Sequence, residues 1–218
     1  MNEDIALLAK LMAIALADTP PREADAAYVF SETADNENSG LATAAELYAA
    51  ARISTICCAG SGPYQPDPKV PEAFSGFDAW SAKLVAMRVV RNDIRGVPIP
   101  EAKWHTGVEA YEYVGLAERE GWQTLFVVAP AFHLPRCFGN VITFIKQRGL
   151  EIKAYAIPGV PLPWHENVLH SQGLVTAPRI QLVDGERERM FKRYGNKYDL
   201  ASLKDMLAYL AWRDGYAS

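Results

Sequence analysis

The stretch that decides the fold is LFVVAPAFHLPR, residues 125 to 136. Its first five residues form a continuous apolar run rich in β-branched and aromatic types, which is typical of a buried strand. Pro130 ends the strand, because proline has no N–H to donate to a sheet. A helical pattern starts at about Phe132 and carries His133 and Arg136, which share one helix face because they are three residues apart. In a parallel α/β sheet this junction lies at the carboxyl edge, where ligands bind.

Working outward, strand patterns alternate with helical patterns along the chain. Strands are expected at residues 26 to 31, 53 to 59, 125 to 129 and 152 to 157. Helices are expected at residues 3 to 17, 41 to 52, 75 to 90, 106 to 120 and about 132 to 148. Residues 31 to 40 are predicted to be a loop, residues 64 to 71 an irregular excursion and residues 96 to 100 a connector. This order predicts an α/β fold, a three-layer Rossmann-like doubly wound parallel sheet with right-handed crossovers and extra N- and C-terminal helices.

The chain is expected to be one domain over residues 1 to 218. Its core would cover about residues 25 to 160, followed by a C-terminal helical extension over residues 165 to 218. Within that extension, helices are predicted at about residues 176 to 194 and 200 to 212, separated by Gly195 and Asn196. These helices would pack outside the sheet or form part of a lid.

Composition limits the function. The chain has 218 residues, 50% hydrophobic and 22% charged, which is enough apolar material for a sizeable core. A formal net charge of -4 argues against a general nucleic-acid binder, which would carry a strong basic excess. The apolar segment at residues 5 to 17 is too short to span a membrane and predicts a buried amphipathic helix. The three cysteines lack zinc spacing, and two of them, Cys57 and Cys58, fall in an apolar run; this predicts no metal site, buried thiols and a cytoplasmic protein.

The loops that follow the strands hold the candidate site residues, because such loops line the ligand crevice of a doubly wound sheet. The loop after the first strand offers four polar side chains: Ser31, Glu32, Asp35 and Asn36. They suit ribose hydroxyls or an amino group, although a solvated acidic loop has the same composition. His133 is the candidate general acid or base, because an unperturbed imidazole titrates near neutral pH, and Glu32 is a second candidate catalytic group. Arg136 lies in the first helical turn, where the helix dipole favours an anion, but pairing with a protein carboxylate is an equal alternative.

A glycine-rich turn follows the second strand. Gly60, Ser61 and Gly62 would allow close backbone approach to a phosphate or carboxylate. Such a turn is more often only a turn, and this one lacks both the glycine fingerprint of dinucleotide sites and a Walker lysine. Its position after a strand keeps it among the candidate ligand contacts.

A connector before the helix over residues 106 to 120 presents His105 and Thr106. Thr106 and Glu109 have the spacing of a capping box, so Thr106 is predicted to be the N-cap of that helix. We expect His105, Thr106 and Glu109 to form the wall of the ligand site opposite His133.

The order of these pieces resembles the YdcF-like family, with this chain as a diverged, soluble member. The resemblance covers roughly residues 25 to 160 and rests on Gly60-Ser61-Gly62, Gly96-Val97-Pro98 and Phe132-His133-Leu134-Pro135-Arg136-Cys137. The family's Asn-Thr-x-Glu-Asn-Ala helix start is matched here only at Thr106 and Ala110. The resemblance implies a Rossmann-like parallel sheet. Because one member of the family is described as binding S-adenosylmethionine, it also implies that ligand.

Three functions are compatible with this pattern. The first is binding of a nucleotide-like or S-adenosylmethionine-like anionic ligand, held by Arg136 and the amides of Gly60, Ser61 and Gly62. The second is a hydrolase or transferase acting on a small phosphate or acyl ester, with acid–base work by Glu32, Glu109 or His133. The third is a non-catalytic scaffold that forms a homo-oligomer through apolar side chains of the C-terminal helices: Tyr194, Tyr198, Leu203, Leu207, Leu210 and Trp212.

Overall fold

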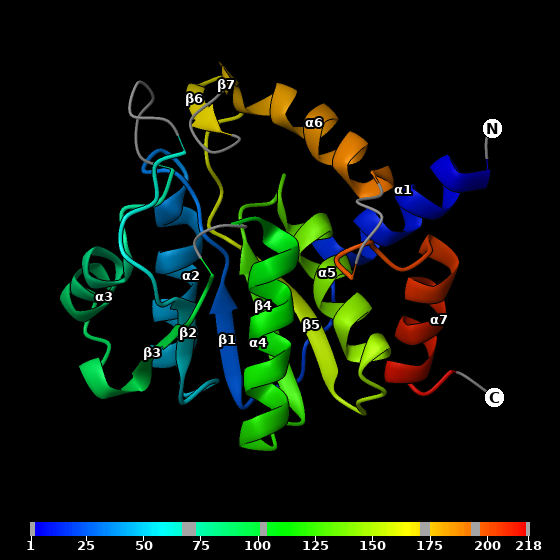
Figure 1. Cartoon of the computed structure of the whole chain (residues 1–218), viewed down its shortest axis with the longest axis horizontal. Helices are drawn as coiled ribbons and strands as arrows, with labels where there is room; N and C mark the ends of the chain where they lie inside the picture. The colour runs from blue at the N-terminus through cyan, green and yellow to red at the C-terminus, as the bar shows by residue number, and fades with distance from the viewer. Residues whose placement is uncertain (1–2, 67–72, 101–103, 171–174, 193–196, 217–218) are drawn as a thin grey trace.

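A five-stranded parallel sheet forms the centre of the protein (Figure 1), in the order β3-β2-β1-β4-β5. The computed structural model describes residues 3–66, 73–100, 104–170, 175–192 and 197–216. The strands of the sheet are β1 (Ala26–Val29), β2 (Ile56–Ala59), β3 (Ile94–Val97), β4 (Thr124–Ala129) and β5 (Lys153–Pro158). The predicted α/β fold with a Rossmann-like parallel sheet is confirmed.

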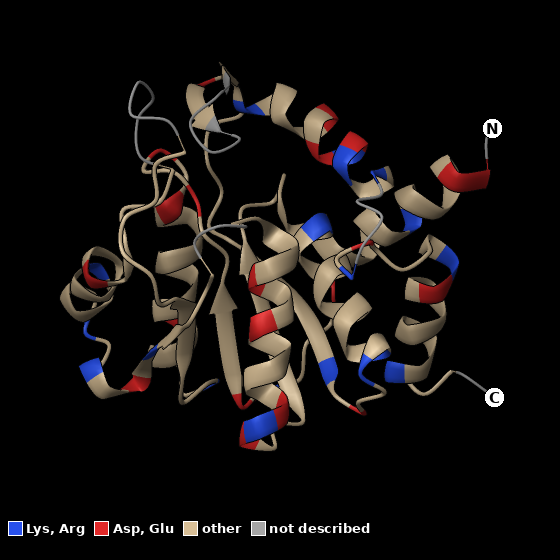
Figure 2. Cartoon of the chain, viewed as in Figure 1, with Lys and Arg blue, Asp and Glu red and all other residues tan. Residues whose placement is uncertain are grey.

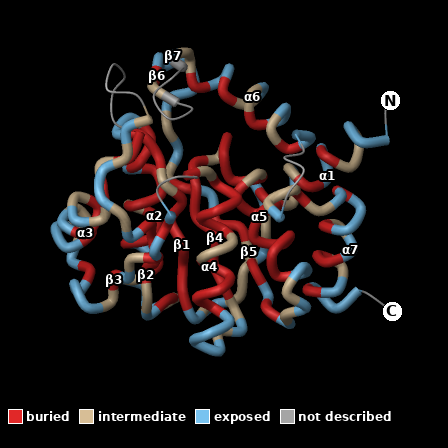
Figure 3. The backbone as a smooth tube through the Cα atoms, viewed as in Figure 1, coloured by how far each residue is buried: buried red, intermediate tan, exposed pale blue. Residues whose placement is uncertain are grey.

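Helices cover both faces of the sheet and one of its edges. They are α1 (Glu3–Leu16), α2 (Glu37–Ala49), α3 (Phe77–Ala86), α4 (Thr106–Glu120), α5 (Leu134–Gln147) and α7 (Leu203–Arg213), and a 3-10 turn lies at Arg91–Asp93. Helices α2 and α3 contact each other on one face, and α4 and α5 pack together on the other (Figure 1). The sheet is buried between them, while the outer sides of the helices are exposed (Figure 3). Within the described residues, no helix is long and apolar enough to cross a bilayer.

The central strands have the apolar composition that burial on both faces requires. Every residue from Leu125 to Ala129 in β4 is fully buried, as are Cys57 and Cys58 in β2. Burial raises the pKa of the Cys57 thiol to about 12, so the thiol stays protonated and unreactive at neutral pH. The prediction that both cysteines behave as small buried hydrophobes is confirmed.

The free edge of β5 is covered by side chains from the two ends of the chain. The Asp18 carboxylate accepts a hydrogen bond from the Ala156 N–H (2.9 Å), and Arg213 donates to the Ala154 carbonyl (2.9 Å). Tyr209 accepts from the Ala154 N–H at 2.8 Å. Asp18 and Arg213 also form a buried ion pair with a shortest distance of 2.7 Å. The terminal segments thus satisfy backbone groups that an edge strand would otherwise leave open to pairing.

A separate cap lies over the carboxyl edge of the sheet (Figure 1). It consists of an antiparallel hairpin, β6 (Asn167–His170) and β7 (Val175–Pro178), followed by α6 (Arg179–Phe191). Its apolar side chains Val168 and Leu182 pack on Phe132, the residue before His133, in a small cluster distinct from the main core. At its far end, Met190 joins the main core. The cap therefore sits on the strand-to-helix junction that carries the candidate site.

Three local predictions differ from the structure. The predicted connector at residues 96 to 100 includes part of β3. This strand was missed because it has only four residues, two of them Arg95 and Gly96, and so gives no apolar run. Helix α2 begins at Glu37 inside the predicted loop, and the predicted all-helical extension contains the β6–β7 hairpin. The predicted helix end at Tyr194, the Gly195–Asn196 break and most of the excursion at residues 64 to 71 lie outside the described residues.

Candidate functional site

The candidate site lies where the chain reverses direction across the sheet. From β1 the chain builds outward through β2 and β3, and it then returns to place β4 on the other side of β1. In doubly wound sheets the crevice at this switch point is the usual ligand site. Glu32 follows β1 and His133 follows β4, and these strands are neighbours, so the topology itself brings the two side chains to the same edge of the sheet.

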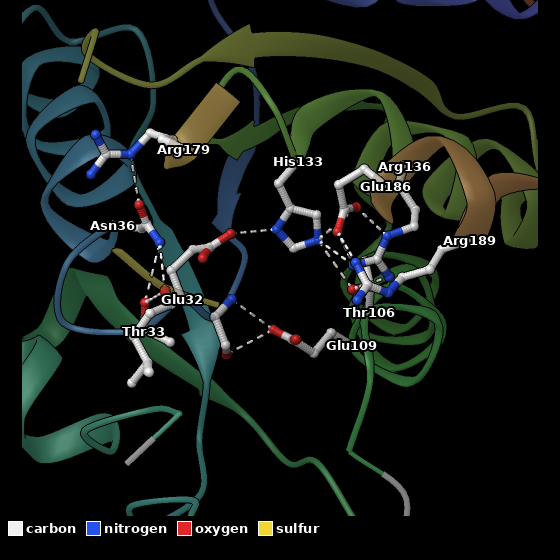
Figure 4. Close-up of polar contacts among 12 residues, drawn as sticks. Glu32, Thr33, Asn36, Thr106, Glu109, His133, Arg136, Arg179, Glu186 and Arg189 are labelled. Atoms are coloured by element: carbon white, nitrogen blue, oxygen red, sulfur yellow. Dashed lines mark hydrogen bonds and ion pairs between the residues drawn. The ribbon is translucent and has the colours of Figure 1, made fainter. Parts of the chain in front are cut away.

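Glu32 and His133 form a buried pair (Figure 4). Glu32 Oε1 lies 2.5 Å from His133 Nδ1, and both residues are 4% exposed. On the other side of the ring, Nε2 lies 3.0 Å from Arg136 Nη2. A carboxylate only accepts hydrogen bonds and a guanidinium only donates them. These contacts fit the tautomer of the imidazole that carries its proton on Nδ1 and presents a lone pair at Nε2.

Thr106 completes the chain of contacts. Its Oγ1 accepts a hydrogen bond from Arg136 Nη1 (2.7 Å) and lies 3.2 Å from His133 Nε2. The hydroxyl keeps its own proton to donate, and Nε2 is an acceptor within its reach that it shares with Arg136 Nη2. Thr106, His133 and Glu32 thus form a hydroxyl–imidazole–carboxylate relay, the arrangement that activates a nucleophile by an oriented base.

Helix α6 of the cap contributes a carboxylate to the same cluster. Glu186 is 3% exposed and receives hydrogen bonds from Arg136 Nε and from Arg136 Nη2, the second at 3.2 Å. Arg189 donates to Glu186 Oε1 at 2.8 Å. Glu186 Oε2 also lies 4.0 Å from His133 Nε2. Acidic and basic residues alternate in the second half of this helix (Figure 2), and the side chain of Glu186 points into the site (Figure 4).

Glu109 fixes the loop that carries Glu32. Its Oε2 accepts hydrogen bonds from the Ser31 N–H (3.0 Å), the Ser31 hydroxyl (2.8 Å) and the Tyr28 hydroxyl (3.0 Å). Burial raises the pKa of Glu109 above its usual range, and the bonds from Ser31 and Tyr28 partly oppose that shift. Because Ser31 directly precedes Glu32, these bonds hold the backbone from which Glu32 reaches His133.

The N-terminus of α4 differs from the capping-box prediction. His105, not Thr106, is the N-cap, and its Nδ1 accepts from the Gly107 N–H at 3.2 Å. Burial, with a smaller contribution from the charge of Arg136, lowers the pKa of His105, which favours the neutral ring needed for this bond. The prediction that Thr106 caps the helix is wrong. As the first helical residue, Thr106 instead directs its hydroxyl to His133.

Two predicted ligand contacts hold the cap instead of facing the relay. Asp35 Oδ2 accepts from the Leu169 N–H (2.7 Å), and Asn36 Nδ2 donates to the Leu169 carbonyl (3.2 Å). Asn36 Oδ1 also accepts from Arg179 Nε at 3.0 Å, and Arg179 is almost fully buried. Their side chains anchor the β6–β7 hairpin and the start of α6 to the loop after β1. A role in ligand binding stays a prediction for both residues.

The glycine turn lies one strand farther along the same edge. The Gly60 N–H donates to the Val97 carbonyl (2.7 Å), and the Ser61 hydroxyl donates to the Ile99 carbonyl (3.0 Å). A Cβ on Gly60 would come within 2.8 Å of the carbonyl carbon of Gly96, so the turn requires glycine there for close packing of β2 on β3. Whether Gly60, Ser61 and Gly62 also bind a ligand stays a prediction.

Sequence reasoning found five members of the cluster and missed others. His133, Glu32, Arg136, Thr106 and Glu109 were predicted site residues, and the structure brings them together. The missed residues are in α6: Glu186, Arg189 and the anchor Arg179. Their segment contains many charged residues, and its pattern gave no sign of which ones would be buried.

Together the fold and the cluster define a doubly wound α/β protein with a capped polar site at the switch point. Comparisons with protein-family models, with curated proteins and with solved structures found no match to this chain. The resemblance to the YdcF-like family therefore stays a prediction, and any functional conclusion depends on the chemistry of the site.

Proposed function

We propose that this protein is a hydrolase or transferase that acts on a small ester through the relay of Thr106, His133 and Glu32. The observation that carries the proposal is the pair of distances at the imidazole, 2.5 Å from Glu32 Oε1 to Nδ1 and 3.2 Å from Thr106 Oγ1 to Nε2. A base oriented by a third group and within reach of a hydroxyl is the usual signature of nucleophilic catalysis.

The relay supports a balanced two-step reaction. The Thr106 hydroxyl transfers its proton to His133 Nε2 while Oγ1 bonds to the carbonyl carbon of the ester. The bond from that carbon to the leaving oxygen then breaks, and the leaving oxygen takes the proton from Nε2. Water or an acceptor alcohol gives its own proton to Nε2 and attacks the acyl carbon. The bond from that carbon to Oγ1 then breaks, and Oγ1 takes the proton from Nε2, which releases the product and restores the hydroxyl. Glu32 stabilises the imidazolium that forms in both steps.

The surroundings of the relay support this role. The pair lies at the switch point, where doubly wound proteins bind ligands, and the cap covers it. Arg136 donates to Thr106 Oγ1 at 2.7 Å, which stabilises negative charge as it develops on that oxygen. Glu109 acts through Ser31 to position Glu32 and is a positioning residue, not a catalytic one.

A second candidate function is binding of a nucleotide-like or S-adenosylmethionine-like molecule without catalysis. The location of the site at the switch point favours it, because nucleotides and dinucleotides bind there in other doubly wound sheets. Isothermal titration with S-adenosylmethionine, S-adenosylhomocysteine and common nucleotides tests this candidate. Saturable heat with one of them, without any change of that compound, would favour the second function over the first.

Hydrolysis of 4-nitrophenyl esters tests the first function. The wild-type protein is expected to release 4-nitrophenol from the acetate ester, and Thr106→Ala and His133→Ala should each lose on the order of 10²-fold or more in kcat. His165→Ala is the matched control, because His165 is exposed. The proposal fails if folded Thr106→Ala and His133→Ala variants both keep the wild-type rate, or if the wild-type protein has no ester activity across a panel of acyl and phosphate esters.

A further inference from the structure

The guanidinium of Arg136 is already engaged within the protein. Its Nε and Nη2 donate to Glu186, its Nη1 donates to Thr106, and Nη2 also lies 3.0 Å from the imidazole of His133. The charge of Arg136 is thus matched by a protein carboxylate placed on it from the cap. An incoming acid group would have to compete with that carboxylate for the same donors.

The structure holds Glu186 firmly in this position. Glu186 is buried on the inner side of α6, and Arg189, one turn farther on, donates to Oε1, which also accepts from Arg136 Nη2. Met190, the next residue of α6, packs in the main core and fixes the end of the helix over α5. A buried carboxylate with charge-assisted bonds from two arginines is costly to displace.

The charges around the reacting atoms do not favour a further anion. Three carboxyl groups, of Glu32, Glu109 and Glu186, surround the relay, against two guanidinium groups, of Arg136 and Arg189 (Figure 4). Like charges in a poorly solvated site repel strongly, because screening by water is weak there.

We propose that Glu186 is a specificity-determining residue that makes the site accept uncharged acyl esters and exclude substrates with a negative charge at the reacting end. This inference rests on the proposed ester chemistry and chooses the acyl ester over the phosphate ester. Glu186 occupies Arg136 as an internal counter-ion, so the arginine serves the Thr106 oxygen and not a substrate anion. Removal of the carboxylate would turn the same arginine pair into an anion site.

Binding of inorganic phosphate tests this role without any turnover. The wild-type protein is expected to show no phosphate binding by calorimetry up to about 10 mM, whereas Glu186→Gln should bind it with a Kd of about 1 mM or tighter. Glu188→Gln makes the same charge change at an exposed position of α6 and should behave as wild type. The double variant with Arg136→Gln in the Glu186→Gln background should lose the gained binding.

Two outcomes would overturn the inference. One is phosphate binding by the wild-type protein tighter than about 1 mM that Arg136→Gln abolishes. The other is a folded Glu186→Gln variant that binds phosphate no better than wild type. If Glu186→Gln does not fold, the wild-type measurement still decides, together with Glu186→Asp, which keeps the charge and should exclude phosphate.

A pair of esters with the same leaving group provides a second readout. The wild-type protein should prefer 4-nitrophenyl benzoate over the 4-nitrophenyl monoester of terephthalate by at least about tenfold in kcat/KM, and Glu186→Gln should narrow that ratio. An equal preference in wild type and Glu186→Gln would contradict the role of Glu186. If neither ester reacts, the proposed function fails, while the phosphate measurement still decides whether Glu186 excludes anions.

Discussion

Replacing Glu32 with glutamine removes one charge next to His133 and changes little else in shape. In the protein, Glu32 Oε1 lies 2.5 Å from Nδ1 and faces the side of the ring away from Thr106. During catalysis the ring becomes an imidazolium, and the carboxylate stabilises that charge. A glutamine offers either a neutral acceptor or, if its NH₂ group faces the ring, a donor. In the second case Nδ1 must accept the hydrogen bond, so the imidazole proton moves to Nε2. There it would face the N–H of Arg136, and two donors would meet.

The size of the effect follows from the distance. Two unit charges about 2.5 Å apart interact by about 6 to 7 kcal/mol at an effective dielectric constant of about 20, and the hydrogen bond of the glutamine recovers part of this. We expect kcat to fall on the order of 10³- to 10⁴-fold, about 4 to 5.5 kcal/mol, as for similar changes in serine-protease triads. KM should change little, because Glu32 touches the imidazole and not the substrate.

Steady-state hydrolysis of 4-nitrophenyl butyrate measures the rate, and ¹⁵N NMR of the imidazole shows which nitrogen carries the proton. Glu23→Gln is the control, because Glu23 is exposed and precedes β1, whereas Glu32 follows that strand. The reasoning is refuted if folded Glu32→Gln keeps a rate close to that of wild type. It is also refuted if the wild-type spectrum places the proton on Nε2 instead of Nδ1.

Three further predictions concern the fold around the site. Arg213→Ala leaves its buried aspartate partner uncompensated and should cost about 3 to 5 kcal/mol. That loss lowers Tm by about 6 to 20 °C in thermal melts. Arg187→Ala, which breaks the exposed pair with Asp184, should cost at most about 1 kcal/mol. Burial raises the folded-state pKa of Glu109 above 4.5. The stability that the protonated carboxyl contributes is therefore present below pH 4.5 and is lost as the pH rises through the folded-state pKa. Glu109→Gln should therefore gain stability relative to wild type between about pH 4 and 7 in urea titrations, and parallel curves would contradict this. Gly60→Ala should cost about 1 to 3 kcal/mol, since its Cβ would meet backbone at 2.8 Å, whereas Gly62→Ala, with open space at that position, should be nearly neutral.

The central strands and half of the site could be predicted because their signals are local. The apolar run of β4 and the turn at Pro130 place His133 at the carboxyl edge, and the strand order then places Glu32 beside it. The relay itself needed the fold, because Thr106 and Glu32 are distant from His133 in sequence. Only the structure shows which of the neighbouring polar residues point to one another.

The cap could not be predicted for a different physical reason. Its helix α6 is strongly charged, and the sequence pattern does not show that Glu186 is buried while Glu188 is exposed. The difference depends on how α6 lies over the sheet, which is set by distant contacts such as Arg179 with Asn36. The scaffold hypothesis also depended on which apolar side chains of the C-terminal helices are exposed. Leu203 and Leu210 are buried in the core of the same chain, Trp212 is partly exposed, and Tyr194 lies outside the described residues.

The most direct test of the relay is mass spectrometry of the protein quenched during turnover of a 4-nitrophenyl ester. The account predicts an acyl group on Thr106, located by peptide mapping, that is present in wild type and absent from Thr106→Val and from His133→Gln. Thr106→Val should also lose turnover on the order of 10²-fold or more, because it keeps the shape of the side chain and removes only the hydroxyl. A folded Thr106→Val variant that hydrolyses the ester at the wild-type rate would contradict the account.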